Sequence, residues 1–241
     1  MIGIIGAGNM AGALARGWGE PVLATDSGSG RAAALVAEVG GEALRDNAEL
    51  ARRADTILLG HKPYQLEQVA AEIDAAGKTV ISVLGGTTVA QLQAAYPDST
   101  VVRTMPNTPV AIRRGVTCIA EGGEVAVPLF ERVGTVFVLP ESQLEAATAT
   151  MGVTPAYVAL IAEASIDAAI RSGLPAPRAT DIFLAALAGS AELLIAREGD
   201  TLGVRREVTS PGGTTARGLA ALEANGLRTA IDQAMRAVIG R

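Results

Sequence analysis

The chain has 241 residues, enough for one large domain or two modest domains with sizeable buried cores. Hydrophobic residues make up 49% of the sequence and aromatic residues 3%, so we expect neither a disordered chain nor an aromatic platform for nucleic acid. The net charge is -5 and no run of Lys or Arg occurs, which also excludes nucleic acid as an expected partner.

The single cysteine, Cys118, rules out an internal disulfide and a cysteine-based metal site, and it fits a reducing compartment. The N-terminus has no basic region before its first apolar stretch, so no cleaved signal is expected. No window approaches about 18 uninterrupted apolar residues, the length of a membrane span. We therefore expect a cytoplasmic protein without metal or membrane.

Short apolar runs alternate with stretches of helical periodicity from residue 1 to residue 140, the pattern of a parallel sheet covered by helices. This predicts an α/β region with a doubly wound, Rossmann-type sheet. The predicted strands are residues 1–6, 21–26, 55–60, 79–85, 100–106, 115–121 and 134–140.

Strand patterns stop after residue 140, and residues 141–241 read as an all-helical second domain. Predicted helices cover much of 155–175, 176–199 and 214–240. The first two are apolar around most of their circumference and so must be buried, although about a hundred residues of helix offer little cover for one another. We therefore expect a dimer whose helices bury each other.

The first predicted strand runs into the sequence GAGNMA, which places Gly6, Gly8 and Ala11 in the spacing G-x-G-x-x-A. The first glycine permits a tight turn, the second lets the backbone approach a pyrophosphate, and the small third residue allows close packing of helix and strand. The N–H groups of Asn9 and Met10 would then face the phosphates at the start of a helix. The motif predicts a dinucleotide site.

The end of the second predicted strand gives conflicting information about the cofactor. Asp26 lies where a carboxylate would accept a hydrogen bond from a ribose 2′-hydroxyl and favour NAD. Ser27, Ser29 and Arg31 follow at once and could hold the 2′-phosphate of NADP. The sequence leaves the choice between NADP(H) and NAD(H) open.

Five segments together resemble the pyrroline-5-carboxylate reductases, in the same order and over nearly the whole chain. They are GAGNMAGALARG near the N-terminus, HKP at 61–63, VVRTMPNTPVAIRRGVT at 101–117, TPAYVALIAEASIDAAIRSGL at 154–174 and VTSPGGTTARGLAALE at 208–223. The Ser-Pro-Gly-Gly-Thr-Thr block is the most specific of them.

The resemblance implies reduction of the cyclic imine 1-pyrroline-5-carboxylate to proline by hydride from NADPH or NADH. It also implies C-terminal helices interleaved across an obligate homodimer, often gathered into a decamer, with NADP(H) as the favoured cofactor. Such a reaction needs two oriented rings and one hydrogen-bond donor near the imine nitrogen.

In the family the last threonine of the block supplies that donor, which maps to Thr215 as the catalytic residue. The substrate carboxylate is expected on the turn and helix start formed by Ser210, Gly212, Gly213, Thr214 and Thr215. The residues expected along the cofactor are Gly6, Ala7, Gly8, Asn9, Met10, Asp26, Ser27, Arg31, Asn47, His61, Lys62, Pro63 and Gly85.

Several positions depart from the family pattern. Met151 and Val153 stand where hydroxyl side chains are usual, and His61 replaces a small or apolar residue before Lys-Pro. His61 would be a proton donor if it faced the nicotinamide, and otherwise a loop residue that packs against the adenine or faces solvent. Two alternatives therefore stay open: a paralogous reductase of another cyclic imine carboxylate, and a non-catalytic dinucleotide-binding regulatory protein.

Overall fold

A computed structural model describes residues 1–240, which form two compact units. The N-terminal unit comprises Met1–Pro155 and the C-terminal unit begins at Ala156. The last strand ends at Leu139, next to the domain boundary expected at residue 140. The helix that follows packs on the sheet, so the contacts place it in the N-terminal unit.

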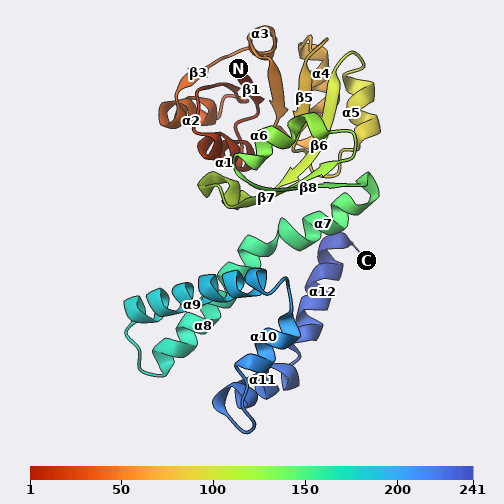
Figure 1. The fold of residues 1–241 in the computed structure, drawn as a ribbon. Coiled ribbons are helices and arrows are strands. Elements are labelled where there is room, and N and C mark those ends of the chain that lie inside the picture. The colour runs from red at the N-terminus through yellow and green to blue at the C-terminus, as the bar shows by residue number, and fades with distance from the viewer. Residues whose placement is uncertain (241) are drawn as a thin grey trace. The chain divides into compact units, whose positions relative to one another are not determined.

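The N-terminal unit is built on one eight-stranded sheet (Figure 1). Its strands are β1 (Ile2–Ile5), β2 (Val22–Thr25), β3 (Gly41–Ala43), β4 (Thr56–Leu59), β5 (Thr79–Ser82), β6 (Thr100–Pro106), β7 (Gly115–Ala120) and β8 (Gly134–Leu139). The strand order is β3-β2-β1-β4-β5-β6-β7-β8, so the chain winds outward from β1 and then crosses to β4 on its other side. This confirms the expected doubly wound sheet.

Two features of the sheet differ from the sequence-based expectation. Strand β3 was not predicted, because its three exposed residues carry no apolar alternation. Strand β7 runs antiparallel to β6, with Met105 opposite Cys118, and β8 is parallel to β7. A short 3₁₀ turn, Thr108–Ile112, joins β6 to β7, and a parallel partner would need a crossover of a dozen or more residues.

Helices cover both faces of the sheet, and each face has its own large hydrophobic cluster, while a third, smaller cluster lies beside β7. One large cluster holds Leu14 and Phe130 and the other holds Leu50 and Leu92. The longer helices of this unit are α1 (Asn9–Trp18), α2 (Arg31–Val39), α3 (Asn47–Arg53), α4 (Leu66–Glu72), α5 (Val89–Ala95), α6 (Val127–Glu131) and α7 (Leu144–Met151). The core therefore lies in two layers, one on each side of a largely parallel sheet.

Trp18, the chain's one tryptophan, ends α1 inside the first of these layers. It is buried, its ring lies edge-on to Phe130 at a centroid distance of 6.1 Å, and its indole Nε1 donates a hydrogen bond to the Leu129 carbonyl. The ring thus buries its apolar surface while satisfying its single donor.

The C-terminal unit is entirely helical, as expected from the sequence. Its helices are α8 (Thr154–Arg171), α9 (Ala176–Ala196), α10 (Thr201–Glu207), α11 (Thr214–Ala224) and α12 (Leu227–Ile239), the first of which begins just before the unit boundary. The stretch 214–240, expected as one helix, is broken at Gly226, whose φ of 76° suits glycine far better than other residues. Helix α10 was not predicted.

The surface of this unit is unusually apolar. Large hydrophobic side chains such as Leu160, Ile182 and Ile195 are exposed, and α8 and α9 each bury one alanine. By length and composition, the helical stretches Glu141–Arg171 and Ala176–Ala196 are long and apolar enough to cross a membrane, a property that core helices of soluble proteins share. Neither stretch is an uninterrupted apolar run, because scattered polar residues interrupt both, but their mean hydropathy is high.

Candidate functional site

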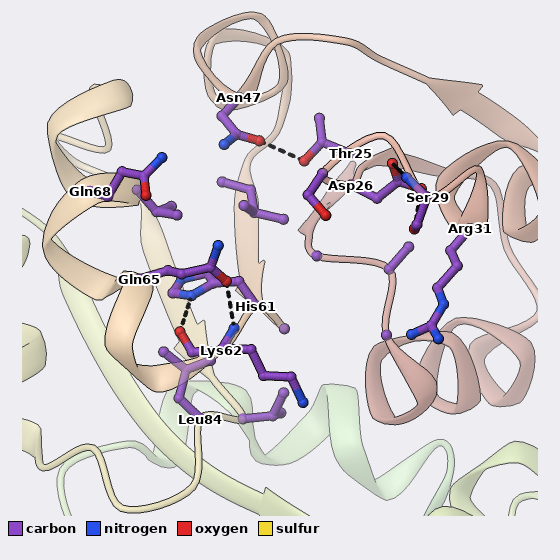
Figure 2. A pocket seen from close by; sticks show the side chains of 18 of the residues that line it. Thr25, Asp26, Ser29, Arg31, Asn47, His61, Lys62, Gln65, Gln68 and Leu84 are labelled. Atoms are coloured by element: carbon purple, nitrogen blue, oxygen red, sulfur yellow. Dashed lines mark hydrogen bonds between the residues drawn. The ribbon is translucent and has the colours of Figure 1, made fainter.

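A cavity of about 830 Å³ opens at the carboxyl ends of β1, β2, β4 and β5 (Figure 2). It straddles β1 and β4, where the winding of the sheet reverses, the usual ligand position in such sheets. The sequence predicts thirteen cofactor-binding residues, and all thirteen line this cavity. Further polar lining residues that sequence reasoning missed are Thr25, Arg45, Asp46, Gln65, Gln68 and Glu72.

The glycine-rich turn after β1 has the form that a pyrophosphate requires. Gly6 has a φ of 93°, and a Cβ there would lie 2.5 Å from the backbone nitrogen of His61, so no larger residue fits. A Cβ on Gly8 would meet nothing closer than the Gly60 carbonyl at 3.6 Å, so the backbone is open to a ligand. Asn9 and Met10, at the start of α1, line the cavity, and the first N–H groups of a helix have no partner within it. Helix α1 also has no side-chain cap, so these donors are available to an anion.

The Asp26 carboxylate accepts hydrogen bonds from residues of its own loop and of the helix start that follows. Its Oδ1 accepts from the N–H groups of Gly28 (2.7 Å) and Ser29 (3.0 Å), and its Oδ2 accepts from the Ala32 N–H (2.7 Å) and the Ser29 hydroxyl (3.2 Å). Burial raises the pKa of Asp26, but these hydrogen bonds outweigh burial and lower it overall. A carboxylate has about four acceptor sites, and here four donors occupy them.

His61 occupies the cavity wall after β4. Burial lowers its pKa, partly offset by its bond to the Lys62 carbonyl and by the charge of Glu72, so the ring is neutral near pH 7. Its Nδ1 lies 2.9 Å from the Lys62 carbonyl oxygen and must donate to it, which leaves Nε2 as an acceptor. A neutral ring in this tautomer is a poor proton donor. Its place in the cavity wall therefore favours a role in packing beside the dinucleotide over a role in proton transfer.

The Ser-Pro-Gly-Gly-Thr-Thr segment forms a turn that leads into α11. The Gly213 N–H donates to the Ser210 carbonyl at 3.0 Å, with Pro211 second and Gly212 third at a φ of 67°, as a type II turn requires. A Cβ on Gly213 would lie 2.4 Å from the Ser210 hydroxyl oxygen, so a larger residue there would have to displace that hydroxyl.

Helix α11 begins at Thr214 without a side-chain cap, so the N–H groups of its first turn have no partner within the helix. Ser210 and both threonines are exposed. The structure thus brings together the five residues predicted to hold and reduce the substrate. They belong to the C-terminal unit, whereas the thirteen cofactor residues belong to the N-terminal unit.

Known proteins match both units. The family model described as "Pyrroline-5-carboxylate reductase dimerisation" matches residues 141–241, and "NADP oxidoreductase coenzyme F420-dependent" matches residues 1–86. The pyrroline-5-carboxylate reductase of Pseudomonas aeruginosa is 32% identical over 258 aligned positions, which cover 100% of this chain and 94% of that protein. This chain belongs to the pyrroline-5-carboxylate reductase family.

Other members of the pyrroline-5-carboxylate reductase family agree. The reductase of Synechocystis sp. is 38% identical over 205 residues, covering 81% of this chain and 77% of that protein. The solved structure of the Streptococcus pyogenes enzyme is 27% identical with a TM-score of 0.89, covering 99% of this chain and 96% of that one. The Plasmodium falciparum reductase, solved with NADP bound, is 26% identical with a TM-score of 0.86 and covers 99% and 95%.

The structure gives Met151, a departure from the family pattern, a place in the core. Its side chain is buried in a cluster with Cys118, Ala120 and Leu144, and its carbonyl accepts a hydrogen bond from the Asn107 amide at 3.1 Å. The methionine therefore anchors the end of α7 to β7 by packing. Its apolar character is explained within the N-terminal unit.

Proposed function

We propose that this chain reduces 1-pyrroline-5-carboxylate to proline by hydride transfer from NAD(P)H, the last step of proline biosynthesis. The observation that carries the proposal is the match to a pyrroline-5-carboxylate reductase over the whole chain, combined with a preformed dinucleotide cavity. The cavity residues fit a dinucleotide because the Gly8 backbone is open and the start of α1 is uncapped.

The turn before α11 and the first residues of that helix would bind the substrate. The N–H groups at the uncapped start of α11 and the exposed Ser210 hydroxyl are the donors available for the substrate carboxylate. The Thr215 hydroxyl would hydrogen-bond the imine nitrogen, and it can change from donor to acceptor as the charge on that nitrogen is lost. NAD(P)H, when bound, supplies the hydride.

Within this function we propose NADPH as the preferred cofactor. The four hydrogen bonds that Asp26 accepts fill its acceptor sites, so it has none to spare for a ribose 2′-hydroxyl. Arg31 and Ser27 line the same corner of the cavity and offer a cation and a hydroxyl for a 2′-phosphate. The name of the matching N-terminal family model and the NADP-bound Plasmodium structure support this choice.

We propose a cytoplasmic homodimer as the working form. The C-terminal family model is one of dimerisation, and the exposed apolar faces of α8 and α9 are those that a second copy would cover. A decamer built from such dimers is the higher assembly implied by the family resemblance. The single, buried cysteine fits a reducing compartment.

The decisive experiment follows the oxidation of NADPH by the purified protein with 1-pyrroline-5-carboxylate, and identifies proline as the product. A six-membered cyclic imine carboxylate serves as the comparison substrate. A clear preference for the six-membered ring would overturn the proline assignment. Binding of NADPH without turnover of either imine, together with an unchanged Thr215→Ala variant, would instead identify a non-catalytic dinucleotide-binding protein.

A further inference from the structure

Three polar side chains on one wall of the cavity form what we call the Glu72 cluster: Asn47, Gln68 and Glu72 (Figure 2 labels the first two). The Asn47 amide Nδ2 donates to Glu72 Oε2 at 2.6 Å, and the Gln68 amide Nε2 donates to Glu72 Oε1 at 3.0 Å. Thr25, at the end of β2, donates its hydroxyl to Asn47 Oδ1 at 2.6 Å. The cluster joins β2, α3 and α4.

The direction of these hydrogen bonds is fixed by chemistry. An ionised carboxylate only accepts, so both amides turn their NH₂ groups toward Glu72, and Asn47 accepts from Thr25. Each Glu72 oxygen receives one donor from the cluster and keeps capacity for another, and the side chain is exposed where it lines the cavity. The neighbouring His61 Nε2 is also an acceptor and has no partner among the described residues.

The order of binding elements assigns this wall to one end of the dinucleotide. The uncapped start of α1 takes the pyrophosphate, and the corner at Asp26 and Arg31 meets the ribose that carries the 2′-hydroxyl or 2′-phosphate. The base on that ribose is adenine, and the next wall, after β4 and along α4, offers the buried Val69 and the Glu72 cluster. The nicotinamide belongs at the opposite end of the pyrophosphate.

We propose that Glu72, held in place by Asn47 and Gln68, accepts a hydrogen bond from the exocyclic amine of the adenine. The cavity is thereby selective for a 6-amino purine over a 6-oxo purine, because a 6-oxo base would turn its own acceptor toward the carboxylate. This inference rests on the proposed dinucleotide function and adds a specificity-determining residue to it.

The test measures Kd by titration calorimetry for NADP⁺ and for its hypoxanthine analogue, with the full-length protein. Wild type should bind the adenine form at least about tenfold more tightly, the worth of one hydrogen bond to a charged group. Glu72→Gln should bring the ratio of the two Kd values toward one, since an amide can present either its oxygen or its NH₂ group. Glu67→Gln, on the exposed side of the same helix and outside the cavity, is the charge-matched control and should keep the wild-type ratio.

The ratio of the two Kd values separates recognition of the adenine amine from other effects of Glu72→Gln. Loss of a negative charge near an anionic ligand, or a loosened α4, would shift both Kd values by the same factor and leave the ratio unchanged. An unchanged ratio in Glu72→Gln, or equal binding of both dinucleotides by wild type, would overturn the inference while the proposed function stands. If wild type bound neither dinucleotide, the proposed function would fail as well.

Discussion

The two units of the chain bury their apolar residues very differently. The N-terminal unit encloses three hydrophobic clusters around its sheet, and residues such as Leu58 and Phe130 are fully buried. In the described part of the C-terminal unit, Ala162 and Ala179 are the buried residues, while larger side chains remain exposed. The N-terminal unit can therefore be stable through its own contacts, whereas the C-terminal unit needs another surface to complete its core.

The largest expected effect comes from a charge on the exposed apolar surface of α8. Leu160 is 65% exposed in the single chain, and Leu160→Asp should break the proposed dimer into monomers and reduce turnover to background. An unpaired carboxylate buried in an apolar interface would cost several kcal/mol. Light scattering coupled to size-exclusion chromatography measures the assembly.

A matched substitution in the N-terminal unit controls for the added charge. Val125 is 58% exposed, and Val125→Asp should leave both assembly and turnover as in wild type. A dimeric and active Leu160→Asp variant would contradict the contrast between the units, because this face of α8 would then be an ordinary solvent-exposed surface.

The next largest effect separates the chemical roles of the two units. Thr215→Ala should lower kcat by about 10²-fold or more, because we propose that this hydroxyl hydrogen-bonds the reacting imine. The Kd for NADPH should stay within about twofold of wild type, because all the predicted cofactor residues lie in the other unit. Steady-state kinetics and a direct binding titration give the two numbers. Equal losses in both would show that the roles are not divided in this way.

A core substitution in the N-terminal unit should have a purely thermodynamic effect. Leu58 is fully buried in β4, and Leu58→Ala should lower the free energy of unfolding by about 2–5 kcal/mol through lost burial and the cavity left behind. Chemical denaturation measures it, with the exposed Val125→Ala as control at about 0.5 kcal/mol or less. If Leu58→Ala also dissociated the proposed dimer under native conditions, the two units would not bury their apolar residues independently.

The smallest effect concerns the loop that Asp26 organises. Asp26→Asn should weaken NADH and NADPH by a similar factor and cost about 1 kcal/mol of stability, because an NH₂ group would face the loop's N–H donors. A selective loss of NADH would instead identify Asp26 as the acceptor of a ribose hydroxyl.

The same variant has an expected pH dependence. Because the pKa of Asp26 is lowered in the folded protein, its stabilising contribution is present above the unfolded pKa and is lost as pH falls through the folded value. The stability gap between wild type and Asp26→Asn should therefore shrink from about pH 7 to about pH 3. Denaturant titrations at the two pH values measure it, and a gap that widened in acid would contradict this sign.

The fold was largely readable from the sequence because its strands are short apolar runs bounded by turns. The gaps have physical causes. Strand β3 is too short and polar to show a period, and the reversal of β7 depends on the length of the connection. The break at Gly226 was hidden because the apolar pattern continues across it.

The sequence predicted those residues of the candidate site whose type is required by the local backbone geometry. Gly6 and Gly8 follow from backbone requirements, whereas Glu72 and Gln68 lie on a helix whose sequence looked like an ordinary sheet cover. Outside the cavity, Asn107 shows the same limit, since its side-chain amide donates to the Met151 carbonyl and accepts from the Val116 N–H. Partners so distant in sequence leave no local pattern.

The position of Trp18 also determines what can be observed by spectroscopy. Because this one indole is buried in the N-terminal unit, its emission reports the loosening of that unit's core and is insensitive to melting of helices α9 to α12. The far-ultraviolet circular dichroism signal, by contrast, reports the helices of both units. A denaturation followed by both signals would therefore resolve the two units without any label, and any lag between the curves would measure how independently they unfold.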